Sequence, residues 1–188
     1  LRAILRHDPD IIMIGEIRDL ETAQIAIQAA LTGHLVFSTL HTNDAPGAVT
    51  RLVDMGLEPF LITSTISGIL AQRLVRRLCP RCRAPAKASD ELLNAFGVEA
   101  SQLTGTLMGP VGCEACQGLG FCGRIGIFEL LPLNEAVRML IVERQPLRAI
   151  RQAAREAGMQ SLREDGLQRA LVGETTVEEV LRTTLSDA

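Results

Sequence analysis

Four cysteines are arranged as two C-x-x-C pairs, Cys79 with Cys82 and Cys113 with Cys116. Each pair forms a tight turn that directs two thiolates at one centre, and two such turns supply the four sulfurs that structural zinc prefers. The sequence therefore predicts one structural Zn²⁺ held by these four side chains. The alternatives are four reduced, partly buried thiols or a thioredoxin-like redox role, which the loop-rich context makes the weaker one. We expect the fifth cysteine, Cys122, to be a free thiol.

Two polar residues each follow a short apolar run of the kind that forms a buried strand. Residues 11–14 precede Glu16, and residues 35–40 precede His41. Because parallel α/β sheets bind ligands at the carboxyl ends of their strands, we expect both side chains at one edge of a sheet. A carboxylate there can hold Mg²⁺ or polarise water, and an imidazole can donate to a phosphate oxygen. Taken singly, Glu16 also fits a helix cap, and His41 also fits a surface side chain bonded to its own loop.

Three arginines could supply further charge to such a site. Arg2 and Arg6 are four positions apart and share a face of a predicted helix, while Arg18 follows Glu16 by two residues. Guanidinium groups bind phosphates or carboxylates across an interface. The plainer interpretation of all three is a solvated basic surface.

The order of the predicted elements explains how these residues are positioned. A short opening helix ends before Pro9, a strand occupies residues 11–14, a helix capped by Asp19 runs to Gly33, and a second strand occupies residues 35–40. Strand, helix and strand in succession are typical of a parallel α/β sheet. Further elements are expected as helices at residues 45–55 and 59–71 and a short strand at 74–75.

The pattern changes at the first cysteine. Residues 79–126 are rich in Gly and Pro and contain one short helical stretch at about 91–96, which is typical of a small insert. Apolar residues recur with helical spacing again after Pro132. The sequence predicts helices at residues 134–143, 146–157, 161–171 and 177–185, the later ones separated by Gly158 and Gly173.

The composition argues against some classes of partner. The chain has 188 residues, a net charge of −3, and neither Trp nor Tyr. A nucleic-acid partner is not expected, because a basic stripe and aromatic side chains for base stacking are both missing. No apolar run approaches the ~20 residues of a transmembrane helix, and no signal peptide is recognisable. Since the chain opens with Leu1 inside a helical pattern, we expect it to be a fragment that starts within a domain.

Two longer stretches carry a family resemblance. Residues 1–19, LRAILRHDPDIIMIGEIRD, resemble the Walker B region of the secretion-superfamily ATPases, and residues 31–43, LTGHLVFSTLHTN, resemble their histidine box. The likeness continues through both cysteine pairs to residues 123–129 and covers essentially the whole chain. It implies an α/β fold in three parts. These are the C-terminal part of a RecA-like P-loop NTPase domain with a parallel sheet at residues 1–78, a tetracysteine zinc subdomain at 79–128, and a helical C-terminal subdomain at 129–188.

The resemblance also implies roles for the residues named above. Glu16 would be the Walker B glutamate, acting on the attacking water or on the Mg²⁺ shell, and His41 would contact or sense the γ-phosphate side of ATP. Arg18 would link the Walker B segment to neighbouring elements and would lie near the nucleotide or a subunit interface. Arg2 and Arg6 would reach the nucleotide or a neighbouring subunit.

Family members of this kind work as cytoplasmic homohexamers that reach the inner membrane through platform and anchor proteins, and the resemblance implies the same here. ATP and Mg²⁺ would bind in the full-length protein, with zinc as a structural ion. The chain has no Gly-Lys-Ser/Thr phosphate-binding loop, and its single lysine is Lys87. We therefore expect the chain by itself not to hydrolyse ATP.

The cysteine pairs and residues 43–52 most resemble the type II secretion branch, in which hydrolysis drives pseudopilus assembly, with type IV pilus extension as the alternative. Retraction ATPases of the superfamily lack the cysteine insert. Residues 113–120 also fit the C-x-x-C-x-G-x-G repeat of DnaJ-type zinc chaperones, but the unit occurs once here and follows an α/β segment. One zinc per chain favours the ATPase, and two favour the chaperone. Relatives place a variable residue where Cys122 stands, which leaves open an exchange of Cys122 for Cys116 as a ligand.

Overall fold

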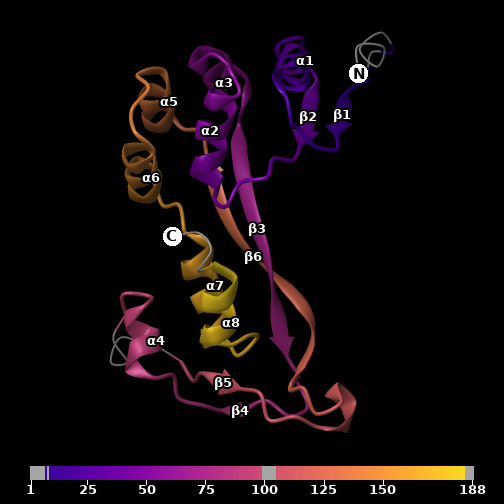
Figure 1. Ribbon diagram of the computed structural model, residues 1–188, viewed down its shortest axis with the longest axis vertical. Helices are drawn as coiled ribbons and strands as arrows, with labels where there is room; N and C mark the ends of the chain where they lie inside the picture. The colour runs from indigo at the N-terminus through magenta and orange to yellow at the C-terminus, as the bar shows by residue number, and fades with distance from the viewer. Residues whose placement is uncertain (1–6, 8, 99–104, 185–188) are drawn as a thin grey trace. The chain divides into compact units, whose positions relative to one another are not determined.

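The computed structural model describes residues 7, 9–98 and 105–184 (Figure 1). Their internal packing divides them into two compact units. The first unit comprises the described residues up to Leu70 together with Leu130–Met159, and the second comprises Ala71–Glu129 and the residues from Gln160 onward. Arg2 and Arg6, with the predicted opening helix, lie outside the described residues. No helix in the described part of the chain has the length and apolar character needed to cross a bilayer.

The first unit opens with a parallel pair of strands, β1 (Ile11–Ile14) and β2 (Leu35–Ser38), joined through helix α1 (Leu20–Leu31). The Asp19 side chain accepts a hydrogen bond from the Thr22 amide at 2.7 Å and so begins α1 as predicted. Ile12 and Ile14 point to one side and are 5% exposed, where they pack with Ala26 and Ala29 of α1. The predicted strand, helix and parallel strand are therefore confirmed.

Four further helices complete the first unit. Helix α1 packs on α3 (Pro59–Thr65), and α3 packs on α5 (Glu135–Val142). Helix α6 (Leu147–Glu156) packs on both α5 and α2 (Ala45–Asp54). Helix α3 is shorter than predicted, since the helix expected at 59–71 ends at Thr65 and a strand begins at Gly68. The β-branched residues Thr65 and Ile66 disfavour helix, and Ile66 is already extended with a ψ of 124°.

The long strands β3 (Gly68–Leu78) and β6 (Phe121–Pro132) pair with each other. Residues 71–78 and 121–129 of these strands belong to the second unit. The short strand expected at 74–75 is thus the middle of a much longer one, and β6 was not predicted at all. Its alternate burial at Ile127, Glu129 and Leu131 has the period of two of a strand. The residue types do not follow this alternation, because buried Glu129 is charged and exposed Leu130 is apolar.

Helices α7 (Leu162–Leu171) and α8 (Val177–Thr184) pack in the second unit, with Leu162 and Val180 against Val75 and Ile127. The division by packing therefore cuts across the predicted segment 129–188, because α5 and α6 belong to the first unit. The cysteine insert holds the remaining elements. These are the antiparallel pair β4 (Ala84–Pro85) and β5 (Met108–Gly109), helix α4 (Asp90–Asn94), and the 3₁₀ turn η3 (Glu114–Cys116).

A buried carboxylate also holds the second unit together. The side chain of Glu179 is 2% exposed and accepts hydrogen bonds from Arg76 Nη2 at 2.7 Å and Arg182 Nη2 at 2.5 Å. Burial alone would raise the pKa of Glu179, but the hydrogen bonds from Arg76 and Arg182 lower it to about 2. The Arg76 guanidinium also stacks on the Phe121 ring at 4.2 Å. This network joins β3 and β6 to α8, and nothing in the sequence pattern singled it out.

Candidate functional site

Glu16 and His41 lie at the carboxyl ends of the two parallel strands. Strand β1 ends two residues before Glu16, and β2 ends three residues before His41. Beyond the strands the two loops stay hydrogen-bonded, since Thr39 Oγ1 donates to the Gly15 carbonyl at 2.6 Å and the Ile17 amide donates to the Thr39 carbonyl at 2.9 Å. The loops that carry the acid and the imidazole are therefore fixed side by side.

The two side chains meet directly. His41 Nε2 lies 2.9 Å from Glu16 Oε2, and Arg18 Nη2 lies 2.5 Å from Glu16 Oε1. The sequence predicted that Glu16 and His41 would share one edge of the sheet, and the structure brings them together there. Arg18, expected near the nucleotide or a subunit boundary, occupies the other oxygen of the same carboxylate.

The charges around Glu16 keep it ionised. The hydrogen bond from the Arg18 guanidinium holds the pKa of Glu16 below its usual range, and the contact with His41 adds to this against a partial burial that acts the other way. The Glu16 side chain is 29% exposed, whereas that of His41 is 83% exposed. At neutral pH the site therefore offers a carboxylate that can accept a hydrogen bond or coordinate a hard cation, not a carboxylic acid.

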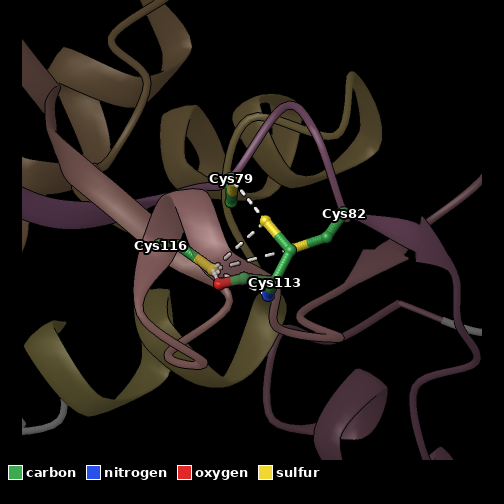
Figure 2. A group of neighbouring side chains, drawn as sticks. All are labelled: Cys79, Cys82, Cys113 and Cys116. Carbon is green, nitrogen blue, oxygen red and sulfur yellow. Dashed lines mark hydrogen bonds between the residues drawn. The ribbon is translucent and has the colours of Figure 1, made fainter.

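The four predicted cysteine ligands form a single cluster in the second unit (Figure 2). All four sulfurs lie within 4.8 Å of one another. Three of the separations are 3.9 Å for Cys79 with Cys113, 3.8 Å for Cys82 with Cys116, and 3.8 Å for Cys113 with Cys116. Four sulfurs bonded tetrahedrally to zinc at ~2.3 Å would lie about 3.8 Å apart, so the cluster has the size of a zinc site.

Backbone amides point at the sulfurs of this cluster. The Gly112 amide donates to Cys82 Sγ at 3.3 Å, and the amides of Cys113 and Gly120 donate to Cys116 Sγ at 3.2 Å each. The amides of Cys113 and Gly120 lower the pKa of Cys116 to about 6, and the amide of Cys113 contributes most. Burial raises the pKa of Cys82 to about 11. The turn thus favours the thiolate of Cys116, and a bound cation would favour ionisation of Cys82.

The loop after the second cysteine pair turns sharply to aim those amides. Gln117 takes a left-handed φ of 54°, and a side chain on Gly112 would meet the Gly118 carbonyl at 2.6 Å. Cys122 is exposed and does not belong to the cluster. The exchange of Cys122 for Cys116 that the sequence left open is therefore absent from this arrangement.

The strand-end geometry defines an α/β protein of the kind that binds a ligand at the carboxyl edge of a parallel sheet. The family model for type II/IV secretion system proteins matches residues 1–182. The chain therefore belongs to the type II/IV secretion system protein family. Because this single match spans the strands and both cysteine pairs, the chaperone alternative is left without support.

Several curated relatives are similar over almost the whole chain. The type II secretion system protein E of Aeromonas hydrophila is 54% identical over 100% of this chain and 37% of its own length. The type II secretion system protein HxcR of Pseudomonas aeruginosa is 56% identical over 98% of this chain and 35% of its own length. The type IV pilus assembly ATPase PilB of Thermus thermophilus is 53% identical over 98% of this chain and 21% of its own length. The chain thus spans well under half of each relative.

Two solved structures share the fold. The pilus retraction motor PilT with bound ADP is 29% identical, with a TM-score of 0.66 over 96% of this chain and 41% of that one. The Legionella pneumophila ATPase DotB gives a TM-score of 0.67 over 100% of this chain and 41% of that one, and at 24% identity this likeness shows the fold alone.

Proposed function

We propose that the chain is part of an ATPase that powers type II protein secretion, and that Glu16 and His41 serve its hydrolysis step. The observation that carries the proposal is the 2.9 Å contact between these two side chains at the carboxyl ends of β1 and β2. The names of the relatives, two of which are type II secretion system proteins, support the same conclusion.

In this proposal the ionised carboxylate of Glu16 orients the attacking water or a water bound to Mg²⁺, and His41 meets the γ-phosphate side of ATP. The donor set fits Mg²⁺, because a carboxylate oxygen is the ligand type that hard cations take. Both oxygens of Glu16 already have donors, one from Arg18 and one from His41. Each carboxylate oxygen has two acceptor sites, so Glu16 can bind a water while Arg18 and His41 stay in place.

The exposed apolar face of the β1–β2 pair supports the proposal that these strands belong to a larger RecA-like domain. One face is covered by α1, but the opposite face exposes Ile11, Met13, Leu35 and Phe37 by 60%, 79%, 52% and 52%. Parallel sheets are normally covered on both faces. A second layer, with the Walker A loop that this chain lacks, would come from the rest of the full-length protein. The 188-residue chain alone is accordingly expected to be inactive.

The tetracysteine cluster is proposed to hold one Zn²⁺ as a structural ion. All four of its ligands are protein sulfurs, which leaves no open position for catalytic water. The ion would tie the turn at Cys79 and Cys82 to the turn at Cys113 and Cys116. It would thereby form the zinc subdomain assigned to residues 79–128.

The assembly proposed for the full-length protein is a cytoplasmic homohexamer, peripheral on the inner membrane through platform and anchor proteins, without a nucleic-acid partner. Type IV pilus extension is the second candidate function. It is favoured by the 53% identity to PilB, which is close to the values for the secretion relatives. Complementation of secretion-deficient and pilus-deficient strains by the full-length protein separates the two.

The substitution Glu16→Gln in the full-length protein tests the hydrolysis role. Gln keeps the size of the side chain but removes the negative charge, so ATP should still bind while turnover falls about 10²- to 10⁴-fold. Steady-state phosphate release and binding of a fluorescent ATP analogue measure the two effects. Wild-type turnover in this variant would remove Glu16 from the mechanism.

A further inference from the structure

The loop that carries His41 is fixed at both ends. Residues 39–44 join β2 to α2, and Thr39 ties the first end to Gly15. At the other end Asp44 is the N-cap of α2, where its Oδ1 accepts from the Gly47 amide at 2.8 Å. A side chain on Gly47 would lie 2.5 Å from Asp44 Oδ1, so glycine leaves room for this carboxylate.

The second oxygen of Asp44 is bound from another helix of the same unit. Arg151 Nη2 of α6 donates to Asp44 Oδ2, and α6 packs along α2 (Figure 1). The Asp44 side chain is 19% exposed and that of Arg151 is 45% exposed. Residues 44 and 151 are thus joined by an ion pair that ends three residues from His41.

We propose that Arg151 is a positioning residue: through Asp44 it fixes the His41 loop, so that the imidazole faces Glu16. The inference rests on the proposed hydrolysis function for its effect on turnover, but its effect on the loop can be measured separately. The His41 side chain is 83% exposed, and its described side-chain contact is with Glu16. Its position therefore depends on the backbone that carries it, and a small displacement of a reacting group lowers a rate strongly.

Arg151→Gln in the full-length protein tests this inference, with Arg148→Gln as the matched control. Arg148 is exposed on the same helix, three residues earlier. In Arg151→Gln we expect faster hydrogen exchange in peptides that cover residues 39–44, and a fall in kcat of about tenfold with little change in KM for ATP. Arg151→Lys should restore part of the kcat, and Arg148→Gln should change neither quantity.

Asp44→Asn provides a second variant. Asparagine caps a helix as well as aspartate does, so α2 is kept while the charge is lost. The kcat losses of Asp44→Asn and Arg151→Gln should not add in the double variant, because both break one link. Unchanged exchange of residues 39–44 in Arg151→Gln, or additive losses, would overturn the positioning role. Wild-type turnover in Glu16→Gln would separately show that the proposed hydrolysis function is wrong.

Discussion

The strand-end site and the tetracysteine cluster differ in how complete they are within this chain. The cluster brings four sulfurs together from two short turns, and its Cys79 and Cys116 are 2% and 5% exposed. The strand-end site leaves His41 83% exposed beside a bare apolar strand face. A site built from local turns is thus finished by its own segment, whereas a site on a sheet edge needs the layers and loops that surround the sheet.

The largest expected effect is on the complete site. Cys79→Ser should reduce zinc from one ion per chain to none, and residues 79–128 should lose their protection from hydrogen exchange. The reason is that structural zinc contributes on the order of 10 kcal/mol of binding free energy to such sites. Elemental analysis measures the metal, and Cys122→Ser is the control that should keep it. Full zinc occupancy in Cys79→Ser would contradict the assignment.

The second largest expected effect concerns the ion pairs that Glu179 forms within the second unit. Glu179→Gln should lower the free energy of unfolding by about 1–3 kcal/mol, because it leaves Arg76 and Arg182 without their shared carboxylate. Since the pKa of Glu179 is lowered to about 2, its contribution is complete above the ordinary value of 4.5 and is lost as the pH falls toward 2. Denaturant titrations at pH 7 and pH 3 measure this. Glu178 is the exposed neighbouring carboxylate, and Glu178→Gln should have the wild-type free energy of unfolding at both pH values.

A smaller effect is expected at the incomplete site. His41→Gln in the full-length protein should lower kcat about 10- to 100-fold with a modest change in KM, because the partner of Glu16 and the proposed phosphate contact are lost together. Phosphate release across ATP concentrations gives both constants. An unchanged kcat would leave His41 as a surface residue, and the strand-end site would then consist of Glu16 and Arg18.

The smallest effect is a shift in pH dependence. Arg18 is the main cause of the lowered pKa of Glu16, so Arg18→Gln should raise that pKa toward its ordinary value. The carboxylate would then protonate at a higher pH, and the acidic limb of the kcat profile should move upward. Arg51→Gln, on the exposed side of α2, is the control. A limb that stays in place or moves downward would mean that Arg18 does not hold the charge of Glu16.

Several features could be read from the residues before any coordinates. The apolar runs before Glu16 and His41, with the capping Asp19 between them, predicted parallel strands joined by a helix, because strand burial and helix capping are local properties. The two cysteine pairs predicted one cluster because two C-x-x-C turns together supply the four sulfurs that structural zinc prefers. The helices of the C-terminal part were also located within two residues of their ends.

Other features depended on partners far away in the sequence. The helix expected at 59–71 failed beyond Thr65, because residues from Gly68 onward pair with the distant strand β6, which begins at Phe121. The link from Asp44 to Arg151 and the network around Glu179 were missed because each joins side chains about 100 residues apart.

The sequence by itself determined the strands β1 and β2, the cap at Asp19 and the turns that carry the two cysteine pairs, since those follow from neighbours within a few positions. Only the tertiary structure decided which donors Glu16 meets, how α5–α8 divide between the two units, and which helix fixes the His41 loop. The physical reason is that hydrogen bonds and ion pairs between distant segments depend on packing, and packing is set by the whole chain.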